Sequence, residues 1–412
     1  MQIFKFGGAS VKDAEGVKNL GKVVTQFGDE QMVIIVSAMG KTTNHLENIS
    51  GLAVNGQPYK KELDELLQYH RQIIDEIEIE VPNSYKDTEH SLMDWCQKVK
   101  GEDVLWSYDQ IVCHGELMST QIIEAYLSLQ CQSHWLDARK LIRTDQYFTE
   151  ANVDWVVTEK QIRKSIIDEH NSCTIVTQGF IGADAEGNST TLGREGSDFS
   201  GSILAYCLGA DRFTVWKDVK GILNADPRIM DQTEKYDFLS YREVTEMTYY
   251  GAQVIHPKTL KPLAQKSIPL EVRSFEELEA PGTLISSRDT QKTIPCFIFK
   301  GNQLLVTSEV KDHNFMNEQK LGMILQVLDL LNIKINLMQN SALTFSFCID
   351  NKEFKAKRIK ELLNRDFILS FEGPLNLATI KNYQDDSFQM LPMDRKVLME
   401  QKTATNYQVL YW

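Results

Sequence analysis

One segment of the chain reads Thr190-Thr191-Leu192-Gly193-Arg194-Glu195-Gly196-Ser197-Asp198. Its two glycines carry no side-chain bulk, so main-chain N–H groups can approach an anion there. Arg194 adds a planar set of donors that suits a carboxylate or a phosphate. Ser197 is a good N-cap for an apolar helix that we expect to begin around Phe199. An ordinary turn from a loop into a helix would also explain the glycines and Ser197, so this segment alone does not establish a site.

Strand-like apolar runs alternate with helical patterns up to about residue 286. The runs are Ile3–Phe6, Met32–Ser37, Ser133–Leu136, Cys173–Gln178, Arg212–Trp216 and Pro269–Val272. This alternation predicts an α/β fold, a mainly parallel sheet with helices on both faces. Ligands bind at the carboxyl ends of the strands in such sheets, so we expect the chemistry in the loops that follow them. Those loops contain Gly7-Gly8, Ser37-Ala38-Met39-Gly40, Gly179–Gly182 and Lys217-Asp218.

The pattern changes around Pro281. The remaining segment reads as strand, helix, strand, strand, helix and strand, at Gln303–Thr307, Phe315–Leu331, Ile333–Met338, Leu343–Ile349, Lys355–Leu363 and Phe367–Phe371. That order predicts a small α+β sandwich, separate from the first 286 or so residues. Between Gly51 and Gly101 lies a polar insert that reads as helices with a solvated, charged face.

Composition limits the partners of the chain. Its 412 residues, 42% hydrophobic and 25% charged, are typical of an ordinary protein with two or three domains. With 57 acidic and 44 basic residues the formal net charge is −13, which argues against nucleic-acid and anionic-membrane partners. We find no charged leader before Ile3–Phe6 and no apolar run of membrane-spanning length, so a cytoplasmic location is expected. The seven cysteines are scattered singly, which favours buried free thiols over zinc ligands or disulfides.

Three further segments carry chemical groups. The opening Lys5-Phe6-Gly7-Gly8-Ala9-Ser10 has the physical logic of a phosphate cradle, although it lacks the Walker spacing. The segment Cys113–Thr120 opens a helix with Glu116, whose carboxylate can hold an amino group, although glutamate is common in first helical turns. Lys217, Asp218 and Arg228 follow another strand-like run and could bracket a nucleotide with its metal.

In these segments the chain resembles the aspartate kinases of the amino acid kinase superfamily, in order, over nearly all of residues 1–286. The matching motifs are Lys5–Ser10, Val36–Gly40 with Thr43-Asn44, Gly115-Glu116, Asp137-Ala138-Arg139, Gln178-Gly179-Phe180, Thr191–Asp198, Asp218–Arg228, and Gly251-Ala252 with His256-Pro257. The Lys-Phe-Gly-Gly opening and the Asp-Ala-Arg segment favour aspartate kinases over the related glutamate, acetylglutamate and uridylate kinases.

The resemblance implies a three-layer catalytic domain at 1–286, with a substrate lobe of about 1–200 and a nucleotide lobe of about 201–286. It implies transfer of the γ-phosphoryl group of MgATP to the β-carboxylate of L-aspartate, the entry step to lysine, threonine and methionine synthesis. The Mg²⁺ would be carried by the nucleotide, and no metal bound by protein ligands alone is expected. An aspartate side chain has a pKa near 3.9, so this nucleophile is already ionised at pH 7 and needs no general base.

The resemblance also assigns roles to residues. The transferring phosphates would lie against Lys5, Gly7, Gly8 and Ser10, with Lys5 balancing the charge that develops in the transition state. The residues expected to hold aspartate are Ser37, Thr43, Glu116 and Arg194, with Glu116 taking the ammonium and Arg194 the α-carboxylate. Asp198 would organise the catalytic lysine and the metal-bound phosphates, and Lys217, Asp218 and Arg228 would lie along ATP.

The sequence departs from the family pattern at five of these positions. Ala9 replaces a common serine or threonine, and Glu195 replaces a glycine beside the anion-binding arginine. Lys217 stands where threonine is usual, Leu223 where a nucleotide-stacking tyrosine is common, and Gln253 where a lysine often approaches ATP. We hypothesise that Lys217 restores the cation that is lost at Gln253.

The segment 287–412 resembles a shortened ACT regulatory domain with one complete unit. Its effector turn is replaced by Lys311-Asp312-His313-Asn314. A structural or dimerising role is therefore favoured over end-product inhibition, and a homodimer is expected. Two alternatives to the aspartate kinase stay open: a kinase of another small carboxylate, and a catalytically silent sensor of an amino acid.

Overall fold

The structure is a computed structural model that describes residues 1–28, 31–168, 173–288, 294–311, 314–391 and 396–412. The chain packs into two units. The first consists of Met1–Ile222, Lys235–Thr245 and Ile255–Thr290, and the second of Leu223–Glu234, Glu246–Val254 and Gln291–Trp412. Two short segments within the first 286 residues thus pack with the C-terminal part. The sequence-based boundary at residue 286 and the division into two lobes stay predictions.

An eight-stranded sheet organises the described residues of the first unit, in the order β3-β4-β2-β1-β7-β9-β10-β8. The strands are β1 (Gln2–Phe6), β2 (Met32–Val36), β3 (Ser133–Leu136), β4 (Thr174–Gln178), β7 (Arg212–Lys217), β8 (Phe238–Ser240), β9 (Leu270–Ser274) and β10 (Thr283–Ser286). Neighbouring strands are parallel except β9 and β10. All six strand-like runs are confirmed as strands of this sheet. A separate hairpin consists of β5 (Ile181–Ala183) and β6 (Ser189–Thr191).

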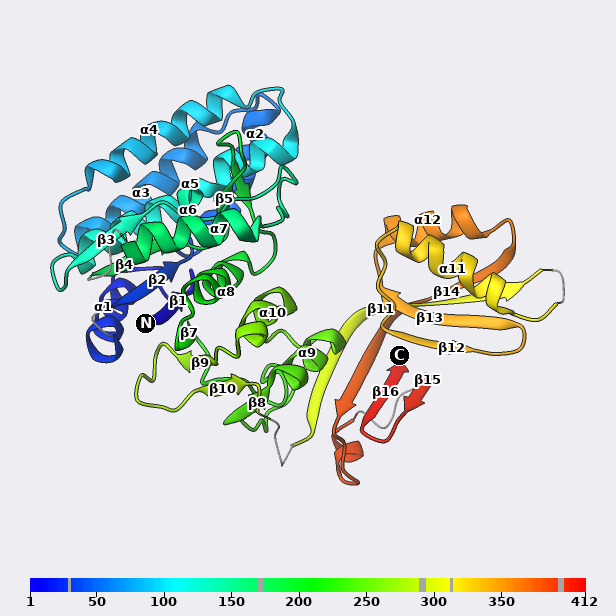
Figure 1. The fold of residues 1–412 in the computed structure, drawn as a ribbon. Coiled ribbons are helices and arrows are strands. Elements are labelled where there is room, and N and C mark those ends of the chain that lie inside the picture. The colour runs from blue at the N-terminus through cyan, green and yellow to red at the C-terminus, as the bar shows by residue number, and fades with distance from the viewer. Residues whose placement is uncertain (29–30, 169–172, 289–293, 312–313, 392–395) are drawn as a thin grey trace. The chain divides into compact units, whose positions relative to one another are not determined.

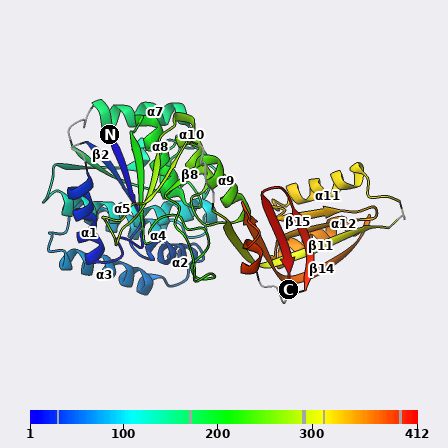
Figure 2. The same ribbon diagram turned by 90° about the horizontal axis from the view of Figure 1, so that it is seen from below.

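Helices cover both faces of the sheet (Figures 1 and 2). They are α1 (Ala14–Phe27), α2 (Thr42–Val54), α3 (Lys60–Glu76), α4 (Asn83–Lys98), α5 (Val104–Leu127), α6 (Ala138–Leu141), α7 (Trp155–Ile162) with the π-helical η1 (Arg163–Asp168), α8 (Gly196–Leu208), α9 (Tyr241–Tyr250) and α10 (Pro257–Lys266). In Figure 2, α7, α8 and α10 lie on one side of the sheet and α1, α3 and α4 on the other. Because both faces are covered, β2 is buried at every position, as its unbroken apolar sequence predicts.

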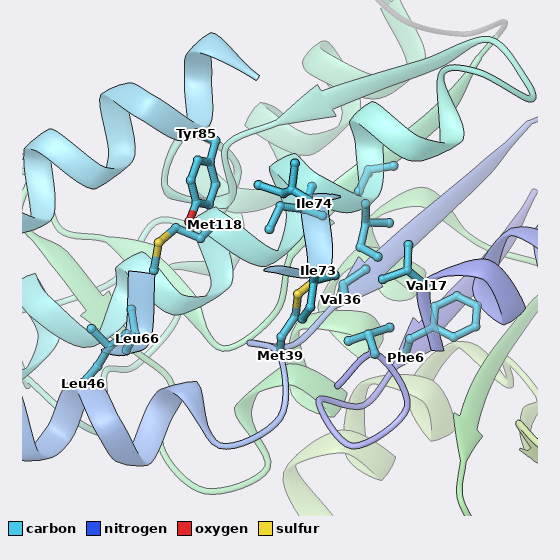
Figure 3. Packing of buried hydrophobic residues seen from close by; sticks show 14 of the residues in the cluster. Phe6, Val17, Val36, Met39, Leu46, Leu66, Ile73, Ile74, Tyr85 and Met118 are labelled. Atoms are coloured by element: carbon cyan, nitrogen blue, oxygen red, sulfur yellow. The ribbon is translucent and has the colours of Figure 1, made fainter. Parts of the chain in front are cut away.

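The largest core lies between the sheet and the helices α1 to α5. Figure 3 shows Val36 of β2 close to Ile73 of the inserted helix α3, and Tyr85 of α4 close to Met118 of α5. The inserted helices α3 and α4 confirm the helical reading of the polar stretch 51–101. Their apolar residues face this core, and most of their charged residues are left at the surface. The exception is Glu89, which is buried and pairs with Arg71 of α3 at 2.8 Å.

Helix α5 differs from its prediction. It begins at Val104, where the Asp103 side chain accepts hydrogen bonds from the N–H groups of Leu105 and Trp106. The expectation that Glu116 lies where a helix opens is therefore wrong, because Glu116 lies near the middle of a 24-residue helix. Its presence there is not explained by the general preference for glutamate in first turns.

The second unit contains an antiparallel sheet with the strand order β12-β13-β11-β14-β16-β15 over its described residues. Its strands are β11 (Cys296–Val310), β12 (Leu337–Asn340), β13 (Thr344–Asp350), β14 (Phe367–Lys381), β15 (Val397–Lys402) and β16 (Asn406–Tyr411), and its helical segments are α11 (Glu318–Leu330), α12 (Glu353–Leu363) and the 3₁₀ turn η2 (Ser387–Met390). The predicted order of strand, helix, strand, strand, helix and strand is confirmed by β11, α11, β12, β13, α12 and β14.

The bounds of all six elements differ from the prediction, and those of β11, β12 and β14 differ most. Strands β11 and β14 are each 15 residues long, because they stay paired through register shifts between Lys300 and Leu305. The strand expected at Ile333–Met338 begins only at Leu337. Asn332, at φ 49°, ends the preceding helix, and residues 333–336 connect it to the strand. Part of the turn Lys311–Asn314 lies outside the described residues.

The described helices include none that is both long enough and apolar enough to cross a lipid bilayer. All seven cysteines are free, and six of them are buried, in agreement with the expectation from their spacing.

Candidate active site

A cavity of about 880 Å³ opens at the carboxyl ends of the central strands of the first unit. Eight of the residues expected from sequence line it: Lys5, Gly8, Ser37, Thr43, Glu116, Arg194, Asp198 and Lys217. They come from β1 and the loop after it, the loop after β2, α2, α5, the start of α8 with the loop before it, and β7, which span more than 200 residues of the chain. The structure thus gathers most of the candidate residues in one place.

Asp198 joins two lysines in this cavity. Its Oδ1 lies 2.6 Å from Nζ of Lys5, and its Oδ2 lies 3.4 Å from Nζ of Lys217. Burial alone would raise the pKa of Asp198, but the two lysines lower it to about 2. The carboxylate is therefore ionised at neutral pH, and the group of three carries one net positive charge.

Glu116 is a buried carboxylate with an incomplete set of partners. Its Oε1 accepts a long hydrogen bond of 3.4 Å from the N–H of Ala38, while Oε2 is buried and has no hydrogen-bond partner. Burial raises the pKa of Glu116 to about 8, against the lowering effects of the Ala38 N–H and of Lys5. An ammonium group placed against Oε2 would satisfy this oxygen and favour the ionised form.

The loops after β1 and β2 approach each other closely at Gly8. A Cβ atom there would lie 2.2 Å from the carbonyl oxygen of Ala38, so only glycine fits. The carbonyl oxygen of Gly8 also accepts a hydrogen bond from the N–H of Gly40. Gly7 and Ser10 do not line the cavity but form the turn behind it, in which the Ser10 N–H donates to the Gly7 carbonyl.

The segment around Arg194 adopts left-handed backbone at Gly193 (φ 75°) and Glu195 (φ 54°). Helix α8 then begins at Gly196, so the expectation of Ser197 as the N-cap of a helix starting near Phe199 is wrong. The left-handed Glu195 redirects the chain into the helix three residues early. Gly196, Ser197 and Asp198 consequently form a first helical turn that lines the cavity, and the positive end of the helix dipole favours an anion there.

Glu195 is directed toward α10. Its carboxylate accepts a hydrogen bond of 2.9 Å from the N–H of His256, the N-cap residue of that helix. The negative charge beside Arg194 is thereby held by a backbone donor.

Besides Gly7 and Ser10, two further residues expected at the nucleotide do not line the cavity. Asp218 is exposed just after β7. Arg228 belongs to the second unit, where its guanidinium forms an exposed ion pair with Asp226 at 2.6 Å. Gln253 and Leu223 belong to that unit as well.

The sequence analysis missed several residues that line the cavity, among them Glu47, Tyr108, Thr149, Glu150 and Phe180. Phe180 lies in a segment that the analysis quoted, just after β4, and its place after a strand was the available signal. The others lie on helices or in a loop between short elements, where no spacing or motif marks them.

Within the described ranges, no three His, Cys, Asp or Glu side chains are grouped so that they could hold a metal ion. Both oxygens of Asp198 face lysines. The ammonium groups of Lys5 and Lys217 give the cavity positive charge that suits an anionic ligand.

A sequence profile described as the amino acid kinase family matches residues 1–274, about two thirds of the chain. The chain belongs to the amino acid kinase family. In this family it is similar to the lysine-sensitive aspartokinase 3 of Escherichia coli (strain K12), with 29% identity over 357 residues that cover 84% of this chain and 78% of that protein. It is 30% identical over 376 residues to the chloroplastic aspartokinase 2 of Arabidopsis thaliana, covering 88% of this chain and 68% of the relative.

A solved structure of an aspartokinase is also similar to this amino acid kinase. The crystal structure of E. coli aspartokinase III in complex with aspartate and ADP, in its R-state, matches with a TM-score of 0.83 and 25% sequence identity. The match covers all of this chain and 96% of that one, so it includes the C-terminal antiparallel sheet as well as the catalytic fold.

Proposed function

We propose that this amino acid kinase is an aspartate kinase, which transfers the γ-phosphoryl group of MgATP to the β-carboxylate of L-aspartate and yields 4-phospho-L-aspartate and ADP. The observation that carries the proposal is the cavity in which Lys5, Asp198 and Lys217 lie with Glu116 and Arg194. The similarity to aspartokinases along most of the chain supports it.

In the proposed complex the aspartate substrate is recognised at both ends of its backbone. Glu116, with its unpaired Oε2, takes the ammonium group, and Arg194 takes the α-carboxylate. Ser37 and Thr43 also line this cavity and supply hydroxyl groups. With both ends held, the β-carboxylate is the free anionic group that can be directed at the phosphate.

The transfer itself needs positioning and charge neutralisation. A β-carboxylate oxygen attacks the γ-phosphorus, the bond from that phosphorus to the β–γ bridging oxygen breaks, and ADP leaves with the bond's electron pair. No proton moves in this step. Lys5 and Lys217 balance the charge on the phosphates, and Asp198 keeps both ammonium groups in place.

The remaining nucleotide contacts are part of the proposal. Gly7, Gly8 and Ser10 shape the turn behind the phosphates, while Asp218 and Arg228 would lie along ATP. Mg²⁺ would enter on the nucleotide, since Asp198 is already engaged by two lysines. The first turn of α8 adds backbone donors for the transferring group.

The C-terminal unit is proposed to be a single ACT-like unit that joins two chains into a homodimer in the cytoplasm. Its β11, α11, β12, β13, α12 and β14 form one complete repeat, with β15 and β16 added to the same sheet. Light scattering of the purified full chain tests the dimer. Addition of lysine and of threonine during turnover tests whether the unit also binds an effector.

The decisive assay measures ATP turnover with L-aspartate and traps the acyl phosphate as its hydroxamate. Hydroxamate that requires L-aspartate and disappears in Lys5→Ala, but not in a Lys12→Ala control at an exposed position, supports the kinase. Product from a different small carboxylate would redirect the substrate assignment. Tight aspartate binding with no product would instead support an amino-acid sensor.

A further inference from the structure

A fully buried carboxylate outside the reacting groups connects two walls of the cavity. Oδ2 of Asp109, on α5, accepts hydrogen bonds from the N–H of Thr149 at 3.0 Å and from the N–H of Thr191 at 2.9 Å. Its Oδ1 accepts a third bond, at 2.7 Å, from the Thr191 hydroxyl. All three donors are therefore held by a side chain that does not line the cavity itself.

These bonds complete the open edge of β6. On its other edge β6 pairs with β5. On the Asp109 side it faces α5, where Gln110 accepts from the N–H of Ser189 and donates to the carbonyl of the same residue. Asp109 then takes the N–H of Thr191, and the Thr191 carbonyl accepts a hydrogen bond of 2.9 Å from the N–H of Ala151. Two neighbouring side chains of one helix and one backbone bond from the Thr149 loop thus replace a partner strand.

The two segments that Asp109 joins carry cavity residues. Thr191 is followed by Gly193 and Arg194, and Thr149 is followed by Glu150, all of which except Thr191 line the cavity. The segments also touch directly, because a Cβ on Gly193 would lie 3.1 Å from Cγ of Glu150. The backbone of Thr149 is left-handed, at φ 71°, which a non-glycine residue keeps only when its surroundings fix it.

Arg194 depends on this backbone for its position. Its side chain makes no hydrogen bond or ion pair within the part of the chain that the structure describes. A guanidinium that binds a carboxylate in a two-pronged geometry tolerates little displacement, and a shift of about 1 Å can cost about a hundredfold in rate.

We propose that Asp109 is a positioning residue for the aspartate half of the site: by tying Thr191 to Thr149 it fixes the segment that presents Arg194. This inference rests on the proposed function. A buried carboxylate is costly to ionise, and burial raises the pKa of Asp109 to about 6 although its three hydrogen bonds lower it. The burial of Asp109 is therefore unfavourable for its ionised form, and its role in the fold is to hold the two segments in place.

The test compares Asp109→Ala with Asp109→Asn. In the asparagine variant the amide oxygen can accept both N–H groups and the amide NH₂ can donate to the Thr191 hydroxyl oxygen, so the arrangement survives. We expect the KM for aspartate to rise at least about tenfold in Asp109→Ala, with the KM for ATP unchanged, and to stay within about twofold of wild type in Asp109→Asn.

Asp184 provides a matched control at the far end of the same hairpin. It is also buried and accepts three hydrogen bonds, from the N–H groups of Glu186 and Asn188 and from the Asn188 side chain. Asp184→Ala should lower the melting temperature but leave the KM for aspartate unchanged. An equal rise in the KM for aspartate in both alanine variants would overturn the positioning role of Asp109, since any loosening of the hairpin would then suffice.

A double variant separates positioning from general damage. Because Asp109 acts through Arg194, the variant with both Asp109→Ala and Arg194→Ala should have the same KM for aspartate as Arg194→Ala alone. Additive effects would contradict the proposal. If Asp109→Ala does not fold, Thr191→Val, which removes only the hydroxyl donor, should raise the KM for aspartate severalfold, and no rise in that variant would overturn the proposal. A wild-type protein without hydroxamate product would refute the kinase assignment instead.

Discussion

Lys217 forms an ion pair with Asp198, with 3.4 Å between Nζ and Oδ2. The other oxygen of the same carboxylate lies 2.6 Å from Nζ of Lys5. Lys217 stands at the end of β7 and Lys5 near the end of β1, and the two strands are neighbours in the sheet. Two ammonium groups from adjacent parallel strands thus meet on one acid from α8. When an anionic phosphate approaches, each lysine can share its donors between Asp198 and the phosphate without a large movement.

We expect Lys217→Ala to raise the KM for ATP about tenfold and to lower kcat, because one charge-assisted contact is worth about 1.5–3 kcal/mol. Steady-state kinetics with ATP as the varied substrate measure the effect. Lys220→Ala removes an exposed lysine three residues away, paired with Glu277, and should leave both constants unchanged. An unaltered nucleotide affinity in Lys217→Ala would remove the case for Lys217 as a phosphate cation.

The pKa of Glu116, raised to about 8 by burial, predicts a pH dependence of aspartate binding. In the free protein at pH 7 Glu116 is mostly protonated, and binding of the substrate ammonium requires the ionised form. Binding at pH 7 should therefore release close to one proton, and affinity should increase as the pH rises toward about 8 and then level off. Calorimetry in buffers of different ionisation enthalpy counts the proton, and Glu116→Gln should abolish the release.

Asp198→Asn should destabilise the free protein, because it leaves the buried Lys5 without its counter-charge. Loss of one partner of a buried ion pair typically lowers the free energy of unfolding by about 3–5 kcal/mol. Because Lys217 is partly exposed, its share of this loss is smaller. Pyrophosphate should raise the melting temperature of this variant more than that of wild type, since an added anion replaces the lost charge. Asp211→Asn, at an exposed ion pair, should melt like wild type.

The pKa of Asp198 also gives the sign of its contribution at low pH. Its pKa is lowered in the folded state to about 2, so the ion pairs stabilise the fold fully above the ordinary aspartate range and are lost as the pH falls toward 2. The difference in the free energy of unfolding between wild type and Asp198→Asn should therefore be smaller at pH 3 than at pH 5, as measured by chemical unfolding.

Glu195→Gln should improve aspartate binding. The glutamine oxygen can still accept the hydrogen bond from the His256 N–H, so the left-handed turn is kept, while a negative charge beside Arg194 is removed. We expect the KM for aspartate to fall about two- to fivefold, in line with the interaction of a half-buried charge with an exposed one. A higher KM would mean that the charge of Glu195 orients Arg194 rather than opposing the substrate.

The sequence predicted the parts of the fold that depend on short-range patterns. Continuous apolar runs such as Met32–Ser37 marked the buried strands, because a parallel sheet with two covered faces needs them. Strands β8 and β10, of three and four residues, are too short to leave such a pattern. Strand β12 was displaced because residues 333–336, in which apolar and polar residues alternate, belong to a connection, which the pattern does not distinguish from a strand.

The candidate site was predicted where residues follow strands and less well where they lie on helices. Lys5 and Lys217 were found from their places at strand ends, and the structure brings both to Asp198. Tyr108 and Glu150 line the cavity but belong to a long helix and a loop, and their place there depends on tertiary packing. The same holds for Asp109, whose bonds to Thr149 and Thr191 join segments 40 and 82 residues away.

Helix α5 has buried residues on every side: from Asp109 to Ile123 all fifteen positions are buried, polar and apolar alike. Most helices at the surface of a protein alternate between tolerant and intolerant positions with a period of about 3.6 residues. Saturation mutagenesis of this protein should therefore show no such periodic alternation of tolerant and intolerant positions between residues 109 and 123. Evolutionary drift in this segment is consequently restricted to substitutions of nearly equal size and polarity, whichever way each side chain points.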